Sequence, residues 1–210
     1  MKVDIWSDVR CPFCYIGKRK FELALEKFPH KDKVEVEWHS FELDQQAKTK
    51  PDMDPAEYLA QKKGQTRKWA VQMNAHVSKV AADAGLHFNI ENAVVANSFN
   101  SHRLIQLAKS MDLGNKMKER LFIAYFIDGK NIDDKAVLTD IGVAAGLEKV
   151  AVENMLDSFD FSNEVRSDEQ IAQQMGINGV PFFIFDQKLA VSGAQPPETF
   201  LGAMQEAWSK

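Results

Sequence analysis

The 210-residue chain contains only two cysteines, so a scaffold stapled by several disulfides and a zinc site built from two cysteine pairs are both excluded. No apolar stretch approaches the ~20 residues of a membrane span. Positive charge is not in excess either, because 26 Lys and Arg face 30 Asp and Glu. The resulting net charge of −4 argues against nucleic acid or an anionic membrane as the main partner. No secretory apolar segment follows Met1, so we expect a cytoplasmic protein.

The two cysteines lie three residues apart, in Cys11-Pro12-Phe13-Cys14, shortly after a strand-like run at residues 3–6. Pro12 suits the first position of a helix. Both sulfurs would then lie in the first helical turn, where residues i and i+3 are close enough for a disulfide. The unpaired N–H groups and the positive dipole end of a helix favour a thiolate there. The spacing therefore predicts a dithiol that attacks other disulfides.

Two other roles for the pair fit less well. A structural disulfide across so short a loop would remove little entropy from the unfolded chain. A zinc ion would need further ligands, and His30 and His39 lack the close spacing of a zinc finger. We therefore predict no metal site. In a reducing compartment a reactive cysteine pair is more often catalytic than structural.

The hydrophobic periodicity predicts sheet character at both ends of the chain. Residues 2–6 and 34–39 alternate as strands and residues 12–28 follow a helical period, which gives β-α-β with a parallel pair. Residues 162–175 favour a helix, residues 180–185 and 189–191 two strands, and residues 197–208 a final helix.

The middle of the chain shows only helical signals. A capped helix start is predicted at Asp54-Pro55-Ala56-Glu57, with a possible break at Lys63-Gly64. We expect helices to end near Gly85, Gly114, Gly129 and Gly146. The predicted organisation is a sheet domain formed by residues 1–44 and 161–210, interrupted by a helical insertion domain at residues 45–160.

Three segments carry a resemblance to a known family. The CxxC after the first strand and the Gly179-Val180-Pro181 element before a late strand resemble the thioredoxin fold, and the helical insertion resembles its DsbA-like branch. Residues 8–18, 179–183 and 97–104 are similar to FrnE-like cytoplasmic members, which are dithiol–disulfide oxidoreductases or isomerases. The expected fold is therefore α/β, thioredoxin-like, with a large all-helical insertion.

The resemblance implies a cis peptide at Val180-Pro181 facing the cysteines. Proline has no N–H to compete at the site, and the extended backbone of Val180 would pair with a substrate strand. The family implies protein or small-molecule thiols and disulfides as substrates. It implies no bound cofactor, and leaves glutathione as a possible redox partner. Nothing in the sequence indicates the oligomeric state.

We predict Cys11 as the attacking sulfur, because it is nearer the helix start and the solvent, and Cys14 as the resolving sulfur. Pro12 and Phe13 would tune the pair. Phe13 supplies no cation or hydrogen-bond donor, so we expect a less oxidising pair than in a periplasmic oxidant. Among the flanking residues, Asp8 would shape the loop, and Arg10 and Lys18 would lie in solvent.

Asn97 and His102 form a polar pair in the predicted insertion, and two interpretations stay open for them. In the first, their helix lines the substrate cleft opposite Cys11, which makes both residues candidates for substrate binding. Alternatively, Asn97 is a helix N-cap and His102 a satisfied side chain in the core.

Two other functions remain to be distinguished from disulfide exchange. One is a glutathione-dependent isomerase or kappa-class-transferase-like enzyme. That group usually has serine where Cys11 stands and lacks the resolving Cys14, whereas both cysteines are present here. The other is a non-catalytic redox-sensing module whose pair alters a partner contact on oxidation.

Overall fold

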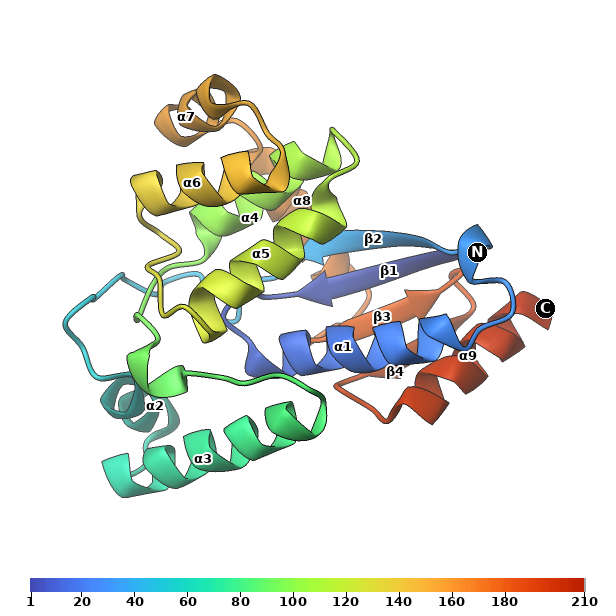
Figure 1. Cartoon of the computed structure of the whole chain (residues 1–210), viewed down its shortest axis with the longest axis horizontal. Helices are drawn as coiled ribbons and strands as arrows, with labels where there is room; N and C mark the ends of the chain where they lie inside the picture. The colour runs from blue at the N-terminus through green and yellow to red at the C-terminus, as the bar shows by residue number, and fades with distance from the viewer. Residues whose placement is uncertain (210) are drawn as a thin grey trace. The chain divides into compact units, whose positions relative to one another are not determined.

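The computed structural model describes residues 1–209 and separates into two compact units. The first, which we call the sheet unit, consists of Met1–Leu43 and the segment from Ser162 onward. The second, the helical unit, is Asp44–Phe161. The chain therefore leaves the sheet unit after one βαβ element and returns to it for the last α-β-β-α stretch (Figure 1).

The sheet unit is built on a four-stranded sheet in the order β2-β1-β3-β4. Strand β1 (Lys2–Ser7) pairs in parallel with β2 (Glu35–Ser40) and antiparallel with β3 (Phe182–Phe185). Strand β4 (Leu189–Ser192) closes a hairpin with β3. The parallel pair requires a crossover, and α1 (Pro12–Glu26) supplies it. The predicted α/β, thioredoxin-like architecture is confirmed.

Helices cover both faces of this sheet. Helix α1 packs against α9 (Pro197–Ser209), and α8 (Ser162–Gln174) packs on β2. Between α1, α9 and the sheet lie Phe21, Phe183 and Phe200, with Phe183 and Phe200 ring centroids 4.6 Å apart. Under α8 a smaller cluster joins Trp6, Ala172, Ile177 and Ile184. Burial of these side chains, at roughly 25 cal/mol per Å² of apolar area, fixes the direction of α1 and hence the place of its first turn.

The helical unit contains six α-helices within the described residues: α2 (Pro55–Lys63), α3 (Arg67–Asp83), α4 (Phe99–Lys109), α5 (Gly114–Phe126), α6 (Lys135–Ala145) and α7 (Lys149–Asp157). Two 3₁₀ turns, Lys31–Lys33 in the sheet unit and Ile90–Asn92 here, complete the elements. The aromatic and methionine residues of α5 face the interior, since Met117, Phe122 and Phe126 are buried. Tyr125 on the same helix is buried as well.

The helix limits differ from prediction at one glycine. Asp54 caps α2, and Gly64 ends it with φ of 61°, as expected. Gly114, however, begins α5 instead of ending a helix. Helix α4 already ends at Lys109, and Asp112, with φ of 59°, supplies the left-handed residue of the turn. Aspartate tolerates this conformation better than most residues, which is why no glycine was needed there.

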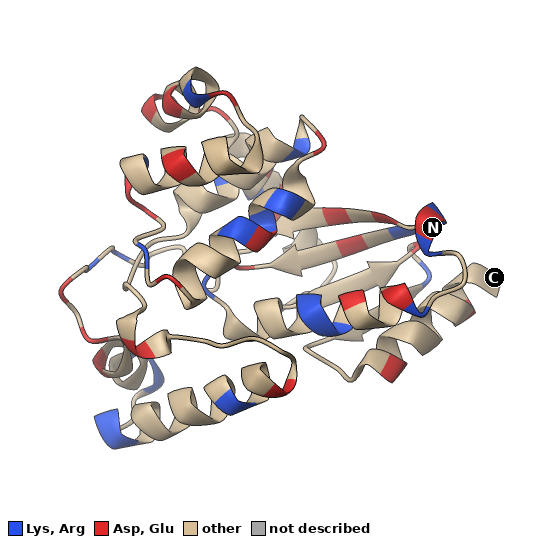
Figure 2. Ribbon diagram, viewed as in Figure 1, with Lys and Arg blue, Asp and Glu red and all other residues tan. Residues whose placement is uncertain are grey.

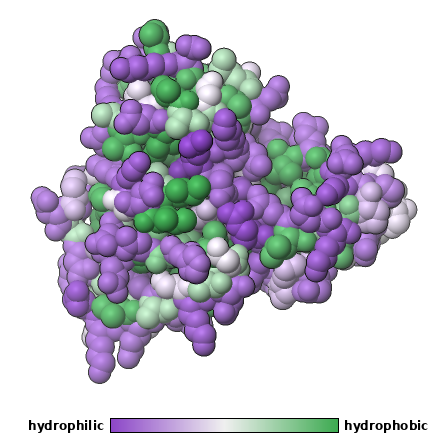
Figure 3. All heavy atoms as spheres, in the orientation of Figure 1, coloured by the Kyte–Doolittle hydropathy of each residue, from purple (hydrophilic) through white to green (hydrophobic). Residues whose placement is uncertain are grey.

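Charges of both signs are distributed over the helices and over β1 and β2 (Figure 2). Hydrophilic side chains cover most of the face seen in Figure 3, with smaller hydrophobic patches between them. None of the helices in residues 1–209 is long and apolar enough to cross a membrane.

Candidate active site

The two cysteines lie at the start of α1. Cys11 is the N-cap residue, in an extended conformation with φ of −88° and ψ of 113°, and Pro12 is the first helical residue. The Cys14 N–H donates to the Cys11 carbonyl at 3.0 Å, which closes the first turn. Both residues are buried, with 5% of Cys11 and 1% of Cys14 exposed, while Phe13 between them is 39% exposed. Phe13 is therefore the most exposed residue of the four.

A loop from the other end of the chain meets Cys11. The Val180-Pro181 peptide bond just before β3 is cis, as the family resemblance implied. The Cys11 thiol donates to the Val180 carbonyl, with 3.6 Å between Sγ and O. Pro181 also packs against α1, because a Cβ on Gly17 would come within 2.9 Å of Pro181 Cγ. Glycine at position 17 thus lets this loop approach the helix closely.

The pKa of the Cys11 thiol is shifted in the direction opposite to the one that the helix dipole alone predicts. The Cys14 side chain and burial raise the pKa of the Cys11 thiol well above its ordinary value, and the charge of Asp8 adds to the rise. The backbone N–H of Cys14 acts in the opposite direction. Removing the proton of Cys11 would place a negative charge beside a second thiol in a buried site, where water cannot stabilise it. The neighbouring thiol and burial thus act against the helix start, which by itself favours the thiolate.

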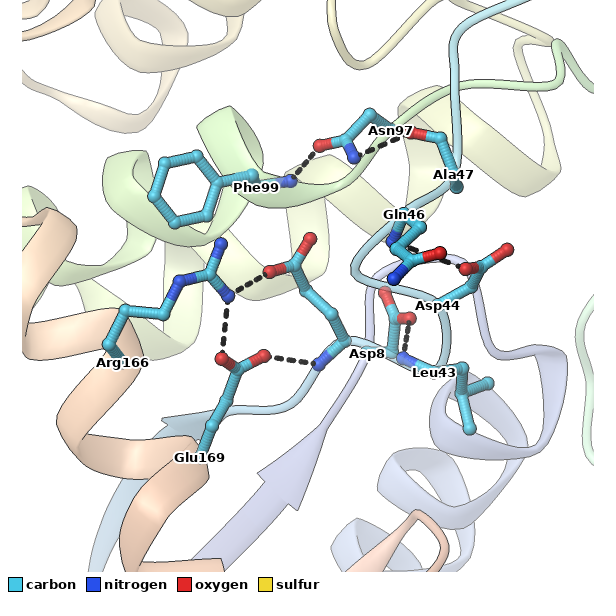
Figure 4. A network of polar contacts seen from close by, with 10 residues as sticks. Asp8, Leu43, Asp44, Gln46, Ala47, Asn97, Phe99, Arg166 and Glu169 are labelled. Atoms are coloured by element: carbon cyan, nitrogen blue, oxygen red, sulfur yellow. Dashed lines mark hydrogen bonds and ion pairs between the residues drawn. The ribbon is translucent and has the colours of Figure 1, made fainter.

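Asp8 organises the loop that carries Cys11. The segment is a β-turn, in which the Cys11 N–H donates to the Asp8 carbonyl at 3.2 Å. The Asp8 side chain accepts the Arg10 N–H at 3.0 Å, the usual local bond of aspartate at a turn. Its second oxygen accepts the Leu43 N–H at 2.8 Å (Figure 4). Asp8 itself is fully buried, so one carboxylate ties the turn before α1 to the segment after β2.

Helix α8 holds the same segment from its other side. The Glu42 N–H donates to Glu169 Oε1 at 3.1 Å. The guanidinium of Arg166 bonds both the Glu42 and the Glu169 carboxylates at 2.6 Å (Figure 4). This network was not predicted, because Arg166 and Glu169 lie more than 120 residues after Glu42.

Lys18 and Arg10 are less exposed than predicted. Lys18 is only 2% exposed, and its Nζ lies 2.5 Å from Glu22 Oε1 in an i,i+4 pair. The prediction that Lys18 lies on the surface is therefore wrong, and a charged side chain buried to this degree is retained because it is paired. Arg10 is half-buried, between the expected solvated arginine and a buried one.

In the helical unit, the segment from Asn97 to Arg103 makes structural contacts. The Asn97 side chain accepts the Phe99 N–H at 2.7 Å and donates to the Ala47 carbonyl at 2.9 Å (Figure 4). His102 is fully buried. Arg103 donates to the carbonyls of Asp160 at 2.8 Å and of Ser158 at 2.7 Å, and also to that of Met155. These contacts hold α4 to its surroundings, and the role of Asn97 and His102 in substrate binding stays a prediction.

A buried charge cluster on the sheet was also not predicted. His39 lies 2.8 Å from both Asp4 and Asp168, and its ring stacks on Trp6 at 4.3 Å. Asp4, Glu37 and His39 each offer one ligand atom within 4.8 Å of the others, which is a possible metal arrangement. Lys2 already fills this place, because its Nζ lies 3.0 Å from Asp4 and 2.5 Å from Glu37. These pairs raise the pKa of Lys2 to about 12, so the three groups face a cation of the chain itself.

The fold and the thiol-bearing helix start define a thioredoxin-type protein, and comparison with known proteins identifies the branch. Residues 2–205 match the DSBA-like thioredoxin domain, so the chain belongs to this oxidoreductase family. The chain is 37% identical to a probable DsbA oxidoreductase, SCO1869, from Streptomyces coelicolor. The two structures superpose with a TM-score of 0.93, over 100% of this chain and 91% of the other.

Two other relatives extend this comparison. The uncharacterized protein YwbO from Bacillus subtilis is 28% identical over 99% of this chain and 98% of its own length. The cytosolic disulfide reductase DsbM from Pseudomonas aeruginosa, solved also with GSH, is 15% identical with a TM-score of 0.67. That likeness covers 100% of this chain and 96% of DsbM, and shows a shared fold.

Proposed function

We propose that the protein is a thiol–disulfide oxidoreductase or isomerase that exchanges disulfides through Cys11 and Cys14. The observation that carries the proposal is the 3.6 Å contact between Cys11 Sγ and the Val180 carbonyl beside the cis-proline. Disulfide exchange needs two thiols close together, and here they lie at the start of a helix. It also needs a backbone segment that can bind the substrate, and Pro181 in that segment has no N–H to compete. Val180 is half-buried, which leaves part of this segment accessible to an extended substrate.

In the reducing direction the chemistry has two steps. Cys11 loses its proton and attacks one sulfur of a substrate disulfide, which forms a mixed disulfide and releases the first substrate thiol with a proton. Cys14 then loses its proton and attacks Cys11 Sγ, which releases the second substrate thiol and leaves a Cys11–Cys14 disulfide. Two electrons and two protons pass to the substrate. Two molecules of a monothiol such as glutathione would restore the dithiol and leave as one disulfide.

The raised pKa of Cys11 supports a reducing or isomerising role over a strongly oxidising one. A strong oxidant such as DsbA is strong because its reduced form is stabilised. Here burial and the neighbouring Cys14 thiol disfavour the Cys11 thiolate, so the reduced form lacks that stabilisation. Phe13 adds no donor toward the sulfur. We therefore expect a reduction potential well below the ~−120 mV of DsbA.

The proposed substrates are protein or small-molecule thiols and disulfides, in the cytoplasm. Phe13, which stands between the two cysteines in the sequence and is 39% exposed, offers an apolar contact to such substrates. Glutathione is the proposed redox partner, and the structure of DsbM with GSH, a protein of the same fold, supports testing it first.

Trapping tests the proposal. Without Cys14 the mixed disulfide on Cys11 cannot resolve, so Cys14→Ser should accumulate adducts under oxidising glutathione, which intact-mass measurement detects. The double variant Cys11→Ser with Cys14→Ser should show none. In the native host, the same trap would identify the natural substrates attached to Cys11.

The three candidate functions predict different results. A glutathione-dependent isomerase would keep its activity in Cys14→Ser, whereas disulfide exchange would stall as the adduct. A redox-sensing module would form the Cys11–Cys14 disulfide once but would not turn over a model protein disulfide with glutathione. Absence of any adduct on Cys11 would reject disulfide exchange itself.

A further inference from the structure

Asp8 is a buried charged residue that takes no part in the exchange reaction, yet it is hydrogen-bonded to Cys11, which does. It is fully buried. Its carbonyl accepts the Cys11 N–H at 3.2 Å, and its carboxylate accepts the N–H groups of Arg10 and Leu43 at 3.0 and 2.8 Å. Both carboxylate oxygens are thus bonded by donors, which is the arrangement of an ionised, acceptor-only group.

We infer that Asp8 is a positioning residue that holds Cys11 against the Val180 loop and places a negative charge near its sulfur, so that the pair favours the reducing direction. The inference rests on the proposed function. A negative charge close to a thiol destabilises the thiolate and leaves the neutral thiol and the disulfide unaffected. Asp8 is therefore expected to lower the stability of the ionised dithiol relative to the disulfide.

The other groups around Cys11 do not reverse this effect. On α1 the nearest titratable group is Cys14, which also raises the pKa of Cys11. The loop before β3 contributes the Val180 carbonyl and carries no charged residue from Gly176 to Pro181. In the segment after β2, Glu42 is paired with Arg166. Arg10, the cation within the turn itself, is half-buried, and the net direction for Cys11 is nevertheless upward.

The test compares Asp8→Asn with the native chain, both cysteines being retained. The rate of Cys11 alkylation by iodoacetamide is followed against pH by peptide mass spectrometry. Neutralising Asp8 should lower the pKa of Cys11. Below that pKa the thiolate fraction rises, and for a tenfold rise the weaker nucleophilicity of a less basic thiolate reduces the rate gain to about threefold. Above it, the variant should react more slowly than the native chain.

The equilibrium with glutathione provides a second readout. As the pH rises toward the pKa of Cys11, the variant should favour the reduced dithiol by a factor that grows with pH. The limit is about tenfold for a one-unit pKa change, or about 30 mV for this two-electron couple. A purely structural role of Asp8 would not give this dependence on pH.

Three further variants separate charge from geometry. Asp8→Glu keeps the charge and should retain the raised pKa of Cys11. Asp8→Ser removes the charge but keeps an acceptor for the Arg10 N–H, and replaces Asp8→Asn if that variant does not fold. Glu169→Gln neutralises a carboxylate that holds the same segment after β2, through the Glu42 N–H at 3.1 Å, and should leave Cys11 unchanged.

The inference is overturned if the neutral variants leave both the alkylation profile and the glutathione equilibrium unchanged, or if Asp8→Glu changes them as the neutral variants do. The proposed function fails separately, if the native chain forms no Cys11–Cys14 disulfide at any ratio of glutathione to its disulfide. In that case the alkylation profile still decides the role of Asp8, because it requires no exchange.

Discussion

Helices α1 and α2 both begin at a proline, yet their first turns are completed in different ways. At α2 the N-cap Asp54 accepts the Ala56 N–H at 2.8 Å and pairs with Arg67 Nε at 2.7 Å. At α1 the N-cap Cys11 makes no side-chain cap bond, and its thiol is directed to the Val180 carbonyl instead. The same proline signal therefore precedes one helix start that is capped and one that is not.

The difference shows that the start of α1 lacks a stabilising contribution that the start of α2 has. A good N-cap stabilises a helix by about 0.5–2 kcal/mol, and α2 has that contribution whereas α1 lacks it. Instead, α1 is held by tertiary contacts, including the packing of Gly17 on Pro181 and the Asp8 turn before Cys11. Because tertiary contacts and not a cap hold the start of α1, the side chain of its N-cap residue, Cys11, remains available for chemistry.

Cys11→Ser should have the largest effect, because it makes the start of α1 resemble that of α2. Serine is a strong N-cap residue, so the free energy of unfolding of the reduced protein should stay constant or rise by up to about 1 kcal/mol. Exchange of a model disulfide should fall to background. Thermal unfolding and a turbidimetric disulfide-reduction assay measure the two effects. Exchange that persists in this variant through Cys14 alone would contradict the assignment of Cys11 as the attacking sulfur.

Gly17→Ala tests the contacts that replace the cap at α1. The added Cβ would lie 2.9 Å from Pro181 Cγ, and such overpacking costs about 1–3 kcal/mol. The loop should also retreat from Cys11, which should slow exchange. Gly202→Ala in α9 is the matched control, since no atom lies within 4 Å of its Cβ position. That variant should gain up to about 1 kcal/mol from helix propensity alone. Equal denaturation midpoints for the two variants would show that the close packing at Gly17 has no energetic weight.

Phe13→His adds a hydrogen-bond donor next to Cys11 at the start of α1, where Phe13 provides none. A protonated or hydrogen-bonding imidazole beside Cys11 favours the thiolate, so the pKa of Cys11 should fall and the reduced form should gain stability. A tenfold shift of the glutathione equilibrium, about 30 mV, is the expected order. Phe13→Leu, which adds no donor, should leave the equilibrium close to that of the native chain, and a comparable shift in this control would assign the effect to size instead.

Asp54→Ala should have the smallest effect, because it leaves α2 uncapped like α1. Loss of the cap should destabilise the chain by about 1 kcal/mol at pH 7 and leave exchange unchanged. The Ala56 N–H and the Arg67 guanidinium hold the pKa of Asp54 below its usual value. A lowered pKa gives stability that is present above the unfolded value of about 3.9 and disappears as pH falls through the folded value. The difference between the two unfolding curves should therefore vanish in acid, and a difference that persists at pH 2 would contradict the role of the carboxylate.

Local patterns predicted much of this fold. The alternation at residues 2–6 and 34–39, the Asp54-Pro55 start and the stop at Gly64 are short-range signals, and each corresponds to an observed element. Gly114 was misinterpreted because a glycine can begin a helix as well as end one, and the turn at Asp112 has no comparable sequence signature.

The sites were predictable only where the chemistry is local. The spacing of Cys11 and Cys14 is visible in the sequence, and the family resemblance added the cis Val180-Pro181 bond. The rise in the pKa of Cys11 comes from the Cys14 thiol, which the spacing places nearby, and from burial, which is not visible before the chain folds. The burial of Lys18 was not predictable either, because it depends on how the folded chain packs around α1. Its i,i+4 spacing from Glu22, however, was a usable signal of the pairing. Asp168 meets His39 across 129 residues, which no local pattern predicts.

The order in which this chain is synthesised has a consequence for its cysteines. Strand β1 pairs Val3 with Phe185, and more than a hundred residues of helical unit emerge between the two halves of the sheet unit. At about 5–20 residues per second, a ribosome needs roughly 6–24 seconds to make that interruption. During this interval Cys11 and Cys14 exist without the Val180 loop, and β1 lacks one neighbour. A nascent chain is therefore open to oxidation or to unintended thiol partners until its final fifty residues have been made.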